Sequence, residues 1–161
     1  MKIVYRELEK ADISKTLLFF ADLAIEDVEV SFTEVVSDDE IDRWLKDDDI
    51  YIYGAFYEEK LIGVFRATRG QESRRHMALL TYAVDRNYRG NQIAKGVISY
   101  GMKRLKEEGI KLVRVYIFSD NRSSINTVLS CDFTLSGCIY QDHYSEKEQK
   151  YIDDLIFHKI L

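Results

Sequence analysis

The sequence constrains the fold most strongly at residues 77–84, where MALLTYAV is a nearly continuous apolar run. A run of this kind, without polar alternation, is typical of a central strand that is covered on both faces of its sheet. Such a strand needs helices on both sides, so it predicts an α/β layer architecture.

Hydrophobic periodicity predicts the other elements around this strand. Apolar residues recur at helical spacing within residues 11–25, 38–46, 93–108 and 122–131. Runs rich in β-branched and aromatic residues predict strands at 2–8, 111–118, 133–144 and 150–161, and a hairpin at 51–68. The sequence therefore predicts one α/β domain over residues 1–161, with a mixed sheet and no internal repeat.

Composition narrows the class of protein. The chain has 161 residues, 46% of them hydrophobic, which is enough for one core, and its net charge of -5 disfavours general nucleic-acid binding. No apolar signal core opens the sequence and no window approaches a membrane span, so we expect a soluble, cytoplasmic protein without a membrane partner. The histidines are scattered and the cysteines lack metal-ligand spacing, so we expect no metal and two reduced thiols, Cys131 and Cys138.

The turn that follows the apolar run has the clearest chemical signal. Residues 89–92 read Arg-Gly-Asn-Gln at the place where a Ser, Asp or Asn cap usually precedes a helix. Gly90 allows a ligand to approach the backbone, Arg89 adds charged donors, and the free N–H groups of a helix N-terminus attract anions. A pyrophosphate fits this combination, but from local spacing alone a glycine that only relieves strain in the turn fits equally well.

Residues 84–94 resemble the signature of the GNAT superfamily of acyl-CoA-dependent N-acyltransferases. In that family a loop of the pattern R-x-x-G-x-G or R-x-x-G-x-A, after the fourth strand, cradles the pyrophosphate of coenzyme A. Arg89 and Ala94 match the pattern, and Gln92 stands in its fourth position, where glycine is usual.

Two further segments are similar to the same family. The stretch DNRSSINTVLSCDF resembles the family's N-x-x-A/S-I/L…GF segment, with Asp132 in place of the glycine and these residues in register: Asn121, Ser124, Ile125 and Phe133. The tail is similar to the ends of RimJ/RimL-like N-terminal acetyltransferases, with Ser136 in place of a glutamate and Gly137, Tyr151 and Asp153 matching.

The resemblance implies a fold and a cofactor site. The sheet would be mostly antiparallel, with splayed central strands and flanking helices, and acetyl-CoA would be the cosubstrate. The implied coenzyme-binding residues are Ala83, Val84, Arg89, Gly90, Asn91, Gln92, Ile93, Ala94, Asn121 and Ser124. For Asn121 a role as helix cap is an equal and compatible alternative.

The catalytic residues are less clear from the resemblance. Many members use a tyrosine on the last helix to protonate the departing thiolate, and this sequence has Val128 there. Ser124, one turn earlier, either donates a hydrogen bond to the sulfur or packs against the coenzyme. His76 is a candidate base acting through water, or an ordinary surface histidine, and the weaker candidates are Tyr82, His143 and Tyr144.

The resemblance predicts an N-acetyltransferase in which a primary amine attacks the thioester directly. The acceptor would be a peptide or protein N-terminus or a small cationic amine, and the protein a monomer or a homodimer. Eleven acidic side chains against two basic ones in residues 26–49 would either attract a cationic amine or form a solvated face. The alternatives are a non-catalytic or sensory coenzyme A-binding module, which Val128 and Gln92 favour, and an anion-binding scaffold unrelated to coenzyme A.

Overall fold

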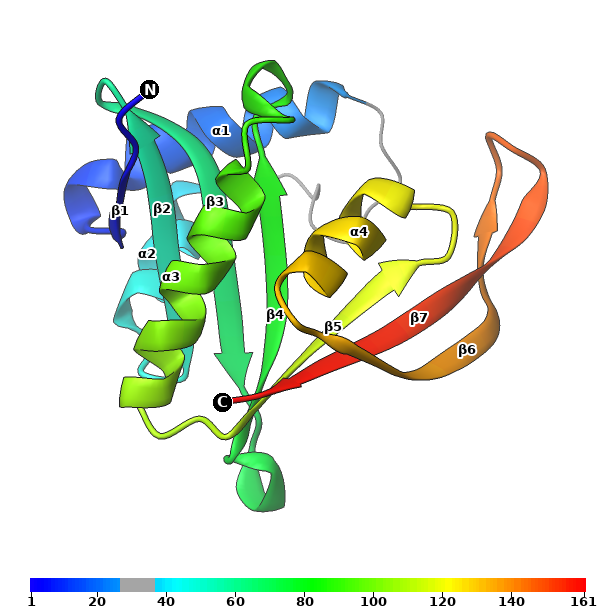
Figure 1. The fold of residues 1–161 in the computed structure, drawn as a ribbon. Helices are drawn as coiled ribbons and strands as arrows, with labels where there is room; N and C mark the ends of the chain where they lie inside the picture. The colour runs from blue at the N-terminus through cyan, green and yellow to red at the C-terminus, as the bar shows by residue number, and fades with distance from the viewer. Residues whose placement is uncertain (27–36) are drawn as a thin grey trace.

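Seven strands form one sheet, in the order β1-β2-β3-β4-β5-β7-β6, in the computed structural model of the chain (Figure 1). The structure describes residues 1–26 and 37–161. The strands are β1 Val4–Glu7, β2 Ile50–Tyr57, β3 Lys60–Arg69, β4 Met77–Val84, β5 Leu112–Phe118, β6 Thr134–Ser145 and β7 Lys150–Ile160. The helices are α1 Ile13–Ile25, α2 Asp38–Lys46, α3 Ile93–Glu107 and α4 Arg122–Ser130, with short 3-10 turns at Lys10–Asp12, Glu72–Arg74 and Arg86–Tyr88.

Helices cover both faces of the first half of the sheet, with α3 on one face and α1 and α2 on the other (Figure 1). The alternation of β3 shows how the sequence builds these two layers. Phe65 packs into a cluster with residues of α3 such as Val97 and Ile98. The adjacent Val64 packs into a second cluster that contains Phe20 of α1 and Trp44 of α2. Side chains of successive strand residues point to opposite faces, so one strand contributes to both cores.

The sheet is antiparallel apart from one pair, β4 and β5, and these two strands diverge. They are paired only where Met77, Ala78 and Leu79 face Leu112, Val113 and Arg114. β5 then pairs with β7 along its whole length, from Leu112 opposite Ile160 to Phe118 opposite Asp154. Past Leu79 the two strands therefore form a fork, visible between β4 and β5 in Figure 1.

The predicted elements are confirmed to within a few residues, and the mixed sheet with splayed central strands is confirmed. The expectation that 77–84 is covered on both faces is wrong in part. Leu79 is 41% exposed, and residues 81–83 are only half-buried. The fork explains residues 81–83, because once β5 leaves β4 the second half of β4 has no neighbouring strand on that side among the described residues. Leu79 is still paired with Arg114, and its side chain is exposed on its own face of the sheet.

Two smaller features bear on the class of protein. Cys131 is buried, Cys138 is exposed and both are free thiols, as expected. Within the described part of the chain, no helix has the length and apolar character needed to span a membrane.

Candidate active site

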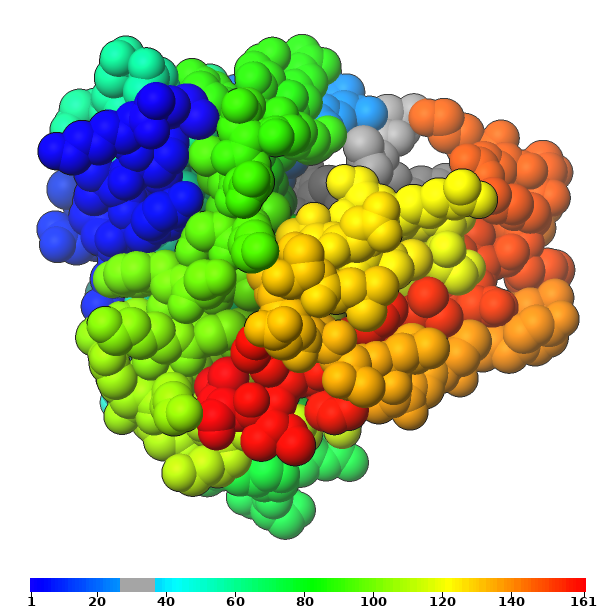
Figure 2. Space-filling view, in the orientation of Figure 1, coloured from blue at the N-terminus to red at the C-terminus, as the bar shows by residue number. Residues whose placement is uncertain are grey.

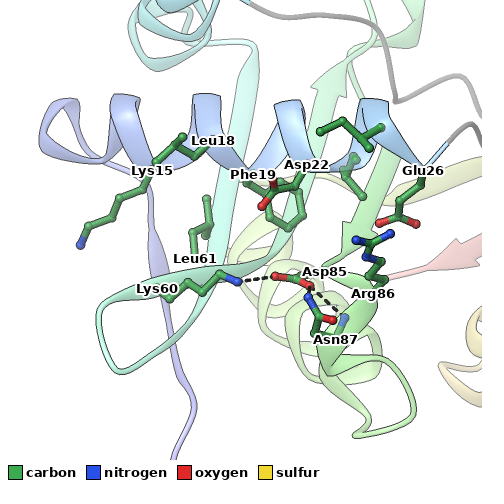
Figure 3. A pocket seen from close by; sticks show the side chains of 12 residues that line it. Lys15, Leu18, Phe19, Asp22, Glu26, Lys60, Leu61, Asp85, Arg86 and Asn87 are labelled. Carbon is green, nitrogen blue, oxygen red and sulfur yellow. Dashed lines mark hydrogen bonds and ion pairs between the residues drawn. The ribbon is translucent and has the colours of Figure 1, made fainter.

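The end of β4 is fixed by a buried carboxylate. Asp85 is 7% exposed and accepts hydrogen bonds from Lys60 Nζ at 2.7 Å, and from the backbone N and Nδ2 of Asn87 at 2.9 and 3.0 Å (Figure 3). These contacts lie beside a cavity of about 290 Å³ between α1, the start of β3 and the end of β4. They hold the Arg86–Tyr88 turn in place, and so they set where the next residues, 89–92, begin.

The turn into α3 leaves the first amides of that helix open. The N-cap residue Gln92 has a left-handed backbone, with φ 59° and ψ 17°, and its side chain makes no cap hydrogen bond. Asn91 Nδ2 instead donates to the carbonyls of Tyr88 and Arg89, at 3.1 and 3.3 Å. The helix ladder starts with the bond from Gly96 N to Gln92 O at 3.0 Å, so the N–H groups before Gly96 have no acceptor within the helix.

Two residues of this turn need a positive φ. Gly90 has φ +79°, and a Cβ built on it would meet no atom within 4 Å, so this side of the turn is open. Gln92 has φ 59°, a region that glycine enters without strain and that other residues seldom adopt. The geometry explains why a glycine is usual at position 92 in the pattern that this turn resembles.

Arg89 is partly engaged within the protein. Its Nε donates to the carbonyl oxygen of Val84 at 3.0 Å, and its Nη2 forms an ion pair with Glu26 at 2.7 Å. The Glu26 side chain is only 8% exposed, whereas that of Arg89 is 49% exposed. The guanidinium therefore links Glu26, which follows α1, to Val84 at the end of β4. About half of the Arg89 side chain still faces solvent.

A groove of about 540 Å³ runs between the N-terminal turn of α3 and the side of α4. In Figure 2 these two surfaces, green and yellow, border each other on one face of the molecule. The groove is lined by Val84, Arg89, Gly90, Gln92, Ile93, Ala94, Lys95, Ser123, Asn126, Thr127 and Ser130. Most of its lining residues have polar or basic side chains, which suits an anionic ligand.

A second cavity, of about 410 Å³, fills the fork between β4 and β5. It shares Val84, Arg89 and Ser123 with the groove, so the two spaces adjoin at these residues. Its walls come from β4, β5, α1, the start of α4 and the β6–β7 hairpin: Leu23, Glu26, Leu80, Thr81, Tyr82, Ala83, Val84, Arg89, Val115, Tyr116, Ile117, Phe118, Asn121, Ser123, Ser124, Asp142, His143 and Asp154. We call this space the fork cavity.

The start of α4 forms one wall of the fork cavity. Asn121 Oδ1 accepts a hydrogen bond from Ser124 N at 3.1 Å, so the cap role weighed for Asn121 is present. The carbonyl of Ser124 accepts from Tyr82 Oη at 3.2 Å, and burial raises the pKa of Tyr82 to about 12. Tyr82 therefore stays protonated at neutral pH. Val128 is fully buried in the core and presents no polar group to the cavity.

The structure brings together most of the residues that the sequence singled out, but not His76. Ala83, Val84, Arg89, Asn121 and Ser124 line the fork cavity, and Gly90, Gln92, Ile93 and Ala94 line the groove. Asn91 lies in the turn between them. His76 is exposed at the opposite end of β4, where its carbonyl accepts from the amides of Lys111 and Leu112. His76 lines neither the fork cavity nor the groove, so its position does not support a catalytic role.

Sequence reasoning missed part of the site. Asp142 and Asp154 line the fork cavity, and so does His143, which the sequence offered only as a weaker base candidate. Their positions depend on how the hairpin folds back beside β5, and no local motif encodes that. The available signal was weak: two carboxylates and a histidine in strands that also contain apolar residues.

The described part of the acidic segment 26–49 contributes little to either space. Asp27, Glu29 and Glu34 lie outside the described residues. Of the acidic residues described, Glu26 lines the fork cavity, while others are used locally: Asp49 forms an ion pair with Arg75 at 2.9 Å, and Asp42 with Lys46. Over residues 1–26 and 37–161, no three His, Cys, Asp or Glu side chains gather in a way that could hold a metal ion.

Comparisons with known proteins agree with this geometry. A family model described as the acetyltransferase (GNAT) family matches residues 17–133. A GNAT family acetyltransferase from Streptococcus pneumoniae superposes with a TM-score of 0.90 at 20% identity, covering 99% of this chain and 100% of that one. No curated protein matches the sequence.

Two other solved structures are similar in fold. A ribosomal-protein-alanine N-acetyltransferase from Brucella melitensis has a TM-score of 0.85 at 23% identity, covering 98% of this chain and 99% of that one. A GNAT superfamily phosphinothricin acetyltransferase from Sinorhizobium meliloti, in complex with acetyl-CoA, has a TM-score of 0.86 at 17% identity, covering 100% of this chain and 89% of that one. At these identities the likeness establishes the fold.

Proposed function

The chain belongs to the GNAT acetyltransferase family, and from this premise we propose that it transfers an acetyl group from acetyl-CoA to a primary amine. One observation carries the proposal: the open amides at the start of α3 lie at a groove that adjoins the fork cavity. Such a path suits a long ligand with an anionic end and a reactive end. Both cysteines are free, in keeping with the cytoplasm, where we place the activity.

The residues present fit acetyl-CoA. Its diphosphate would lie against the open amides of Ile93 and Ala94, with Gly90 leaving room and Arg89 contributing charge. Its pantetheine arm would follow the edge of β4 at Ala83 and Val84, which has no strand partner on that side among the described residues.

The acyl transfer takes place in the fork cavity, where acetyl-CoA supplies the activated acetyl group as a thioester. The nitrogen of the amine forms a bond to the acetyl carbon, and the carbon–sulfur bond breaks. An ammonium acceptor loses two protons in the process, of which one ends on the coenzyme sulfur and the other leaves to water. Bringing the two reactants together in one walled space supplies much of the rate.

Two hydroxyls stand near the expected place of the sulfur. Ser124 lines the fork cavity and is the donor we propose for the departing sulfur. Tyr82 is a second donor, although its hydroxyl is engaged with the carbonyl of Ser124 at 3.2 Å. With a pKa of about 12, Tyr82 contributes as a hydrogen-bond donor and is too weak an acid to surrender its proton to a thiolate fully.

A non-catalytic coenzyme A-binding module is the second candidate, and a specific observation favours it. Val128, at the position where many members of the family carry their acid, is buried in the core. Such a module would bind coenzyme A in the groove but would not transfer an acetyl group.

Two measurements on the purified chain test the proposal. Calorimetric titration with acetyl-CoA should show binding, and incubation with acetyl-CoA and a panel of amines should release free thiol only when an amine is present. Binding without thiol release would favour the sensory module, and no binding heat would contradict both.

A further inference from the structure

The wall of the fork cavity opposite β4 carries ionisable side chains from the C-terminal hairpin. Asp154 of β7 lines the cavity together with Asp142 and His143 of β6. Asp154 is in register with Phe118 of β5 on one side and with Ile139 of β6 on the other. The hairpin therefore brings two carboxylates and an imidazole to the place where the strands diverge.

An irregularity in β6 presents two of these groups. Ile139 faces Asp154 but His143 faces Ile152, so β6 contains two more residues than β7 over this interval. Gln141, inside the irregularity, has φ 52°, and its N–H donates to Asp153 Oδ1 at 2.8 Å. Bulges of this kind redirect side chains and are frequent beside active sites.

The redirected imidazole packs on the wall of the cavity. The rings of His143 and Phe118 stack with centroids 4.8 Å apart and planes 11° from parallel. This stacking holds His143 beside the strand position that faces Asp154.

One oxygen of Asp154 has no hydrogen-bond partner in the described part of the chain. Its Oδ1 is shielded from solvent and has no hydrogen-bond donor among residues 1–26 and 37–161. Burial raises the pKa of this carboxyl, the nearby carboxylate of Asp142 raises it further, and His143 opposes the rise. Because Oδ1 is shielded from solvent, a ligand cannot bond to it directly; Asp154 nevertheless lines the cavity, and an ammonium group there would offset the cost of its buried negative charge.

We propose that Asp154, supported by Asp142 and His143, is the acceptor subsite of the fork cavity and binds the ammonium group of a cationic primary amine. This inference rests on the proposed function and names its acceptor class. Asp154 also takes the first proton: one N–H bond of the ammonium breaks, the proton joins the carboxylate, and the freed lone pair attacks the thioester carbon. The protonated Asp154 returns its proton to water after the product leaves.

The charge of the described cavity wall restricts the acceptor further. Its acidic side chains are Glu26, Asp142 and Asp154, and its one arginine, Arg89, is already paired with Glu26. A carboxylate next to the amine of the acceptor would be repelled by this wall, whereas a second positive charge would be attracted. The subsite therefore favours diamines and amidated peptides over free amino acids.

Steady-state kinetics with Asp154→Asn test the inference, because asparagine keeps the shape and removes the charge and basicity. Thiol release is measured with a linear diamine, a peptide amide with a free N-terminus, and free glycine. The control is Asp153→Asn, an equal change on the next residue of β7 that keeps an oxygen for the Gln141 amide.

The expected result for Asp154→Asn with the diamine at pH 7 is a loss in kcat/KM on the order of 10² or more, as for removal of a general base. The loss should shrink as the pH approaches the pKa of the amine, because solvent then deprotonates the acceptor. Acetyl-CoA affinity should stay within about twofold of wild type, and Asp153→Asn should follow the wild-type pH profile.

Opposite outcomes are readily distinguished. An Asp154→Asn variant with wild-type rate and pH profile would overturn the subsite while leaving the acetyltransferase intact. Free glycine accepted better than the diamine would overturn the acceptor class. A wild-type protein that binds acetyl-CoA but acetylates no amine would overturn the proposed function, and the subsite with it.

Discussion

α3 and α4 line the same groove, but the first turns of the two helices are built differently. At α4 the side chain of Asn121 accepts a hydrogen bond from Ser124 N at 3.1 Å. At α3 the N-cap Gln92 makes no such bond, and the side chain of Asn91 points back to the preceding turn. A helix that caps its own amides has less positive potential for an external anion, so the anion-binding end of this groove belongs to α3.

Placing a negative charge at the start of α3 should have the largest effect. Gln92→Asp would set a carboxylate beside the open amides, where it competes with and repels a diphosphate. We expect acetyl-CoA to bind at least about tenfold more weakly, or about 1.4 kcal/mol, by calorimetry. Gln92→Asn is the matched control, because asparagine tolerates a left-handed backbone and is neutral, and it should bind within about twofold of wild type. Equal affinities of the two variants would place the diphosphate elsewhere.

Removing the arginine of the same turn should have the next largest effect. Arg89→Ala should raise the KM for acetyl-CoA about three- to tenfold with a smaller change in kcat, because the contact exists before the chemical step. The kinetics are measured at saturating amine. Equal losses in kcat and kcat/KM would contradict a simple binding role.

Removing the charge of Glu26 should strengthen acetyl-CoA binding, which is the opposite of the effect expected for Arg89→Ala. Its carboxylate holds Arg89 Nη2 at 2.7 Å, so it competes with any anion for that guanidinium. Glu26→Gln should therefore tighten acetyl-CoA binding about two- to threefold, and the gain should vanish in the double variant with Arg89→Ala. A weaker-binding Glu26→Gln would mean that the pair orients Arg89 for the ligand and does not compete with it.

Removing the cap of α4 should lower the stability of the protein and leave acetyl-CoA binding almost unchanged. Asn121→Ala removes the cap of α4 and should cost about 1 kcal/mol, which lowers Tm by about 2–4 °C for a chain of this size. Acetyl-CoA affinity should change by less than twofold. Asn121→Ser restores a cap and should recover most of the lost Tm; a large loss of affinity in either variant would assign Asn121 a direct ligand contact.

The groove and the fork cavity differ in how far the sequence could predict them. The groove residues that the sequence predicted, at the start of α3, lie in a short segment, 89–94, so a local pattern was sufficient to find them. Asp142 and Asp154 reach the cavity only because the hairpin pairs with β5 and carries an irregularity between Ile139 and His143. Long-range strand register of this kind has no local sequence signal.

The partial failure for residues 77–84 has a related cause. An apolar run predicts burial on both faces, and Met77, Ala78, Leu80 and Val84 are indeed buried. Leu79 and the half-buried 81–83 are not, and for 81–83 the cause is the divergence of β5, which is a property of the whole sheet. The strand was predictable from its apolar run, whereas the divergence of β4 and β5 was implied only by the family resemblance.

The two places where the sequence departs from the family's glycines share one backbone geometry, and that gives the subtlest test. Gln92 has φ 59° and Asp132, just after α4, has φ 63°, so each holds a left-handed position that glycine adopts without strain. Gln92→Gly and Asp132→Gly should each release about 1 kcal/mol of strain, offset in part by the greater freedom of glycine in the unfolded chain. Both variants should therefore raise Tm slightly, by up to about 3 °C.

The two variants should differ in ligand binding. Only Gln92→Gly alters the groove, so only that variant should change acetyl-CoA affinity. An equal change in Asp132→Gly would mean that the affinity follows overall stability and not the open turn.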